Sequence, residues 1–118
     1  MNHLRYLILA TTVFLLACNS NAQMAFDRAK WLQKDSTGYP FRDLMLNDLT
    51  TQHQLKGLTK QELIELLGRS ENSWEIDKEL FYPIVRRYDE PVHIKWLAIR
   101  LDSKSKVEHF EIVDNRKK

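Results

Sequence analysis

The sequence has few residues of the kinds that cross-link a small chain or shape a phosphate loop. Its 118 residues include one cysteine, three glycines and three prolines. A single cysteine, Cys18, excludes an intramolecular disulfide and a multi-thiolate metal cluster. Isolated glycines exclude a glycine-rich phosphate loop. The core must therefore be held by packing alone.

No apolar run is long enough to span a bilayer as a helix. The longest covers residues 6–17 and is broken only by Thr11 and Thr12, whereas a spanning helix needs about 20 apolar residues. A short basic start followed by such a run is typical of a secretory signal. The run ends in Leu15-Leu16-Ala17-Cys18, which resembles the lipobox of bacterial lipoproteins. We therefore predict that residues 1–17 are a lipoprotein signal peptide and that Cys18 is lipidated.

An excess of charge of one sign is also absent. Cleavage before Cys18 removes Arg5 and no acidic residue, which leaves 17 basic and 16 acidic side chains. A nucleic-acid binder needs a concentrated basic surface, so this balance argues against nucleic acid as a partner. The length suits one domain. We divide the mature chain into a lipidated tether and N-terminal segment (18–40), a domain (41–114) and a basic tail (115–118).

The first half of the domain carries helical patterns. Apolar residues recur at helical spacing over residues 41–52, which predicts a first helix. A second helix is predicted over residues 60–67, because Thr59 and Glu62 form a capping-box pattern before a wide apolar stripe. Gly68 follows as its stop.

The second half changes to an alternating pattern. Period-two runs predict strands over residues 78–86, 92–101 and 107–113, joined by short polar turns. On the second strand, Trp96 lies on one face and Leu97 and Ile99 on the other. The predicted fold is α+β, with two helices packed on a three-stranded antiparallel meander in a single small domain.

The stretch from Leu55 to Gly68 resembles the signature of the SmpA/OmlA family of lipoproteins. That family includes the small lipoprotein subunit of the outer-membrane β-barrel assembly machinery. The shared features are a glycine, an apolar residue, a threonine and a short helix ending in Leu-Gly, found here at Gly57, Leu58, Thr59, Leu63, Leu67 and Gly68. The chain is closer to uncharacterised short lipoproteins that carry this domain. The resemblance implies an outer-membrane location, facing the periplasm, and an envelope or outer-membrane protein partner.

Residues able to perform catalysis are sparse. His53, His93 and His109 lack metal-ligand spacing, so no metal and no cofactor is expected. His93 and His109 lie on adjacent predicted strands, which leaves open a weaker hypothesis of a hydrolase, although solvent-facing histidines are the simpler interpretation. We expect a protein that is not an enzyme.

Aromatic and basic residues gather in the sheet region and offer a better functional candidate. They either fill the core or form a partly exposed surface of the composition that interfaces favour. The candidate binding surface consists of Trp74, Tyr82, Arg86, Tyr88, Lys95 and Trp96. We predict a lipid-anchored binding module that supports outer-membrane protein assembly or envelope integrity. The alternative is an inhibitor or sensor domain that binds a secreted enzyme or peptide through its sheet face, which exposed Leu97, Ile99 and Leu101 would favour.

Overall fold

A computed structural model describes residues 23–71 and 78–116 of the chain. These residues form three helices, α2 (Arg28–Leu32), α3 (Arg42–Gln52) and α4 (Lys60–Leu67). The strands β1 (Glu79–Arg87), β2 (His93–Leu101) and β3 (Val107–Asp114) form one antiparallel sheet in the order β1-β2-β3. The α+β fold with a three-stranded meander is confirmed.

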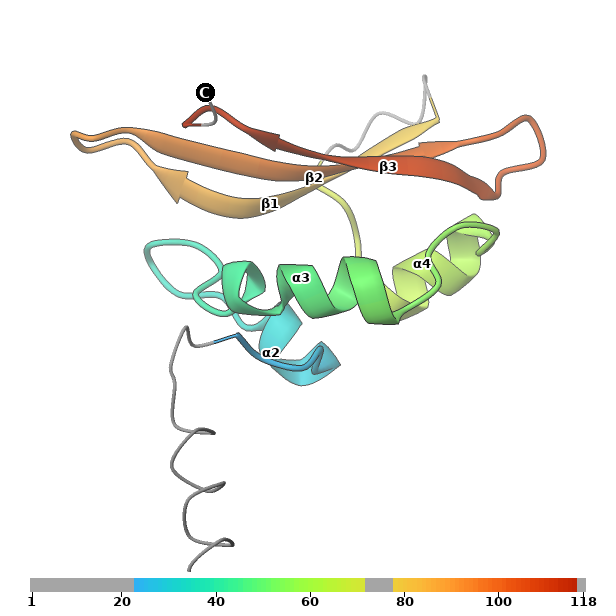
Figure 1. Cartoon of the computed structure of the whole chain (residues 1–118), viewed down its shortest axis with the longest axis horizontal. Helices are drawn as coiled ribbons and strands as arrows, with labels where there is room; N and C mark the ends of the chain where they lie inside the picture. The colour runs from blue at the N-terminus through green and yellow to red at the C-terminus, as the bar shows by residue number, and fades with distance from the viewer. Residues whose placement is uncertain (1–22, 72–77, 117–118) are drawn as a thin grey trace, which may run out of the picture.

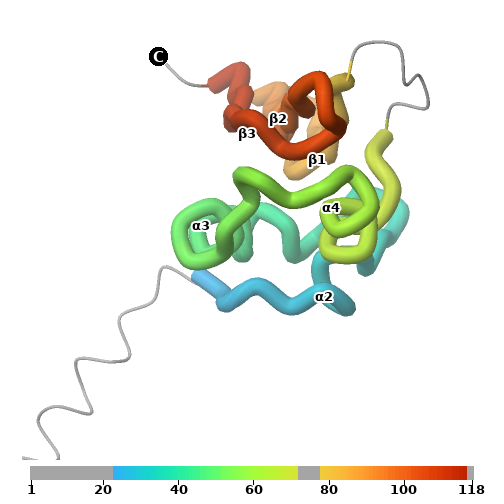
Figure 2. The backbone as a smooth tube through the Cα atoms, turned by 90° about the vertical axis from the view of Figure 1, so that its right-hand side faces the viewer, coloured from blue at the N-terminus to red at the C-terminus, as the bar shows by residue number. Residues whose placement is uncertain are grey.

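The elements stack in layers, as Figures 1 and 2 show. Helices α3 and α4 lie against one face of the sheet, and α2 packs beneath them on the side away from the strands. Among the described residues, no helix or strand covers the opposite face of the sheet. We call that face the open face.

Helix α4 begins and ends where the sequence predicts. The Thr59 hydroxyl accepts a hydrogen bond from the Glu62 N–H at 3.1 Å, and the Glu62 carboxylate accepts one from the Thr59 N–H at 2.9 Å. These two bonds satisfy donors that a helix start otherwise leaves unpaired. The helix ends at Gly68, whose φ of +79° suits glycine alone among common residues.

The core lies between the sheet and the helices. On the face of β2 turned toward the helices, Leu97, Ile99 and Leu101 are all buried. The remaining core members come from all three helices, the loops and the flanking strands: Trp31, Met45, Leu46, Leu49, Leu55, Leu63, Leu67, Leu80, Tyr82, Ile84 and Val107. The helices therefore cover the leucine-rich face of β2 and leave the Trp96 face open.

Residues 24–40 pack as part of the globule. Trp31 of α2 is fully buried, and its indole N–H donates to the Leu67 carbonyl at 3.0 Å. Arg42 at the start of α3 is also buried and donates to the carbonyls of Trp31 and Pro83, each at 2.9 Å. One side chain thus joins α2, α3 and β1. The sequence did not predict α2, because five residues are too few for a helical period to be recognised.

Candidate functional site

The open face carries an aromatic cluster near the middle of the sheet. Phe81 and Trp96 meet edge to face, with ring centroids 6.4 Å apart and planes at 89°. Val113 pairs with Trp96 across β2 and β3 and is 47% exposed. Together with Glu71 these side chains line a hollow of about 330 Å³. We call it the aromatic hollow.

Register explains why these residues meet. In an antiparallel sheet, alternate residues point to the same face and cross-strand partners lie side by side. Phe81 pairs with Ala98, and Ala98 pairs with Glu111, so these three form one row on the open face. The neighbouring row contains Trp96 and Val113. Small Ala98 leaves room between the larger side chains.

Ion pairs lie beside the aromatic hollow. The Arg86 guanidinium lies 3.1 Å from the Glu71 carboxylate and 6.0 Å from the centre of the Trp96 ring. On the other side, Arg100 and Glu79 pair at 2.9 Å. Each pair is balanced in charge, so the hollow is an apolar site with a polar border. This arrangement is typical of a protein-binding surface.

The structure describes five of the six residues predicted as a binding surface, and of these Arg86 and Trp96 lie together. Trp74 lies outside the described residues, as does Cys18. Tyr88 follows the end of β1 and is 71% exposed, and it lines a separate hollow of about 790 Å³ between residues 34–40 and 84–89. Lys95 points toward the helices, where its ammonium lies 2.7 Å from the Asp43 carboxylate.

The prediction that Tyr82 contributes to the surface is wrong. Tyr82 is fully buried, and its hydroxyl donates to the Gly68 carbonyl at 2.8 Å. Burial raises the pKa of Tyr82 above its ordinary value. Burial likewise lowers the pKa of Arg42 to about 10, so this side chain stays charged at neutral pH. Both residues hold the core together and are unavailable to a ligand.

The sequence did not single out Glu71 or Val113 as site residues. Val113 belongs to the last strand, and Glu71 reaches the site because its backbone N–H donates to the Phe81 carbonyl at 2.8 Å. The alternating pattern of residues 107–113 was the available signal for Val113. No local signal marks Glu71, because the contact depends on how the chain returns from α4 to β1.

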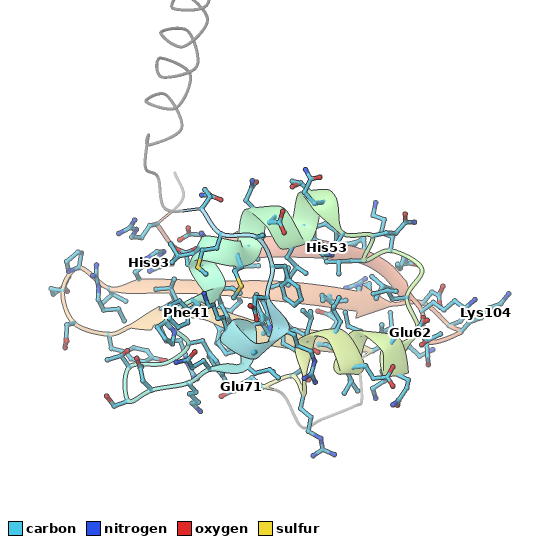
Figure 3. The ribbon with its side chains drawn as sticks, turned by 90° about the horizontal axis from the view of Figure 1, so that it is seen from below. Phe41, His53, Glu62, Glu71, His93 and Lys104 are labelled. Carbon is cyan, nitrogen blue, oxygen red and sulfur yellow. The ribbon has the colours of Figure 1, made fainter. Side chains whose placement is uncertain are left out.

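The two strand histidines do not come together. His109 pairs with Arg100, whereas His93 pairs with Arg87 toward the other end of the sheet. Figure 3 shows His93 and the Lys104 turn toward opposite ends. His93 is 8% exposed and lies 3.1 Å from the Asp114 carboxylate, so the expectation that it faces solvent is wrong. Nothing joins the two rings into one site.

The described residues contain neither a metal site nor a membrane-spanning helix that would add to this geometry. Within residues 23–71 and 78–116, no three His, Cys, Asp or Glu side chains gather as a metal site. In the same part of the chain, no helix has the length and apolar character to cross a membrane. No family model, no curated protein and no solved structure matches the chain.

Proposed function

We propose that the chain is a lipid-anchored, non-enzymatic binding module of the bacterial envelope that holds a protein partner on its open sheet face. The observation that carries the proposal is the aromatic hollow. Phe81, Trp96 and Val113 present apolar surface there, and the Arg86–Glu71 pair borders it. Aromatic centres with polar rims are the usual anatomy of binding sites for protein side chains.

The anchor and the location rest on the sequence. The lipobox-like ending of the first apolar run supports lipid attachment at Cys18. A tether raises the effective concentration of the domain near other envelope proteins, so modest intrinsic affinity is enough. The resemblance to the SmpA/OmlA family supports a role in outer-membrane protein assembly or envelope integrity, on the periplasmic side of the outer membrane.

The alternative of an inhibitor or sensor domain has less support. Exposed Leu97, Ile99 and Leu101 would have favoured it, and all three are buried beneath the helices. A secreted enzyme or peptide could still occupy the aromatic hollow. The identity of the bound protein separates this alternative from the envelope role.

Photocrosslinking in intact cells tests the proposal. Val113, which lines the aromatic hollow, is replaced by a photoreactive phenylalanine analogue in the full chain. Tyr88, exposed but outside the hollow, receives the same analogue as the matched control. We expect a discrete adduct with an envelope protein from position 113 and none of that mass from position 88. A folded, membrane-bound chain that gives no adduct at position 113 would contradict the proposal.

A charge variant and a deletion strain test the binding role and the assembly role separately. Glu111→Lys changes an exposed residue in the row beside Trp96 without touching the core, and we expect it to weaken the adduct at position 113. A deletion strain reports on the process itself. Unchanged levels of outer-membrane barrel proteins in that strain would remove the assembly role while leaving the binding role intact.

A further inference from the structure

The described chain begins on the helical side of the molecule. The Met24 N–H donates to the Leu44 carbonyl of α3 at 2.8 Å. The segment that leads into α2, drawn in blue, lies below α3 and away from the sheet in both Figures 1 and 2. Residues 19–22 alone separate Cys18 from Gln23, and a chain of that length reaches at most about 18 Å. The lipid anchor is therefore held close to the helical side.

The charged side chains of residues 28–34, which cover α2 and the two residues after it, are all basic, and we call this segment the basic surface of α2. Arg28, Lys30 and Lys34 are all exposed, and residues 28–34 contain no acidic side chain. An acidic residue flanks this stretch on each side, and each accepts local hydrogen bonds. Asp27 accepts one from the Lys30 N–H at 3.2 Å as the helix cap, and Asp35 accepts from the N–H and the hydroxyl of Thr37 at 2.8 and 2.6 Å. Basic side chains close to a bilayer are attracted to anionic headgroups.

The open face is neither close to the tether nor basic. Its arginines, Arg86 and Arg100, are each paired with a glutamate, and Glu111 is exposed nearby. Adjacent layers of secondary structure lie about 10 Å apart. A domain lying on its open face would therefore hold residue 23 about 20 Å above the headgroups, which the tether from Cys18 does not reach. Lying on α2 requires no such extension.

Building on the proposed lipid anchor, we propose that the basic surface of α2 rests on anionic lipid headgroups. The aromatic hollow then points away from the bilayer, where it meets a protein partner rather than lipid. Three features support this orientation: the point at which the tether enters, its short reach and the position of the basic residues. The α2 surface is thus a second interaction surface, distinct in chemistry from the open face.

Site-specific fluorescence on vesicles tests this orientation. The full chain is expressed in bacteria with Ala29→Cys on α2 or Glu111→Cys on the open face, both exposed positions. A lipidated Cys18 has no free thiol, so the dye attaches only to the new cysteine. The labelled proteins are reconstituted into phosphatidylethanolamine–phosphatidylglycerol vesicles that carry a headgroup quencher. We expect the dye at position 29 to be quenched at least about twofold more than the dye at position 111.

Charge variants identify the cause of the orientation. Lys30→Gln with Lys34→Gln removes two charges from residues 28–34. Lys104→Gln with Lys106→Gln removes two from the exposed β2–β3 turn as the matched control. We expect the first pair, and high salt, to reduce quenching at position 29, and the control pair to leave it unchanged. Equal or stronger quenching at position 111 overturns the orientation while leaving the lipid-anchored binding module intact. A chain that takes up two dyes and lacks lipid by mass refutes the anchor, and the proposed function fails with it.

Discussion

Removal of the buried guanidinium of Arg42 should destabilise the whole globule. Two charge-assisted hydrogen bonds, to the carbonyls of Trp31 and Pro83, each measure 2.9 Å, and each contributes about 1.5–3 kcal/mol. The guanidinium carbon also lies 3.4 Å from the centre of the Tyr39 ring and 4.6 Å from that of Trp31. Such cation–π contacts add about 1 kcal/mol.

Burial of the charge opposes these gains. Desolvation is the main cause that lowers the Arg42 pKa from 12.5 to about 10, and this net lowering corresponds to about 3 kcal/mol against the charged form. Arg42→Met removes this penalty together with the favourable contacts and leaves two carbonyls without their partner. The net loss of unfolding free energy should be about 2 kcal/mol. For a domain of this size that corresponds to a fall of about 8–16 °C in Tm.

Urea unfolding followed by tryptophan fluorescence measures the effect, because Trp31 is fully buried in the native state. Arg69→Met, at an exposed position, serves as the control and should change stability by no more than about 0.5 kcal/mol. Arg42→Lys keeps the charge but has no planar fork to reach both carbonyls, so it should also destabilise. If Arg42→Met unfolds at the same urea concentration as the unmodified chain, the assignment of Arg42 as the link between α2, α3 and β1 is refuted.

Three other perturbations test particular contacts. Thr59→Ala removes the hydroxyl that caps α4 and should lower the unfolding free energy by about 1 kcal/mol in urea titration; an unchanged midpoint would show the cap to be dispensable. Gly68→Ala should lower the unfolding free energy by about 2 kcal/mol, because a φ of +79° and a ψ of −172° strain a residue that carries a side chain. The added Cβ would also lie 2.7 Å from Cδ2 of Leu32, but this side chain is flexible, so that contact costs less. Asp114 has its pKa lowered below 3.8 mainly by the Arg116 N–H, so its stabilising effect is present above about pH 4 and disappears as the pH falls through the lowered value. The stability gap between Asp114→Asn and the unmodified chain should therefore close in acid, and a gap that persists at low pH would contradict the assignment.

Much of the fold follows from local signals in the sequence. Thr59, Glu62 and Gly68 determine where α4 begins and ends, because capping bonds and a positive φ depend on neighbouring residues alone. The alternating runs likewise located the three strands to within one residue at each end. The period of two also separated Trp96 from Leu97 and Ile99 correctly.

Tertiary packing decided which face of the sheet became a surface. Both faces of β2 are apolar, so alternation alone could not show that the helices would cover Leu97 and leave Trp96 open. Because the helices cover this face of the sheet, Tyr82 is buried and Lys95 lies against Asp43 of α3. Glu71 joined the aromatic hollow through a backbone bond to a residue ten positions away. The sequence by itself predicted α3, α4, the three strands and the lipid attachment at Cys18. The aromatic hollow, in contrast, exists only because long-range packing placed the helices on one side of the sheet.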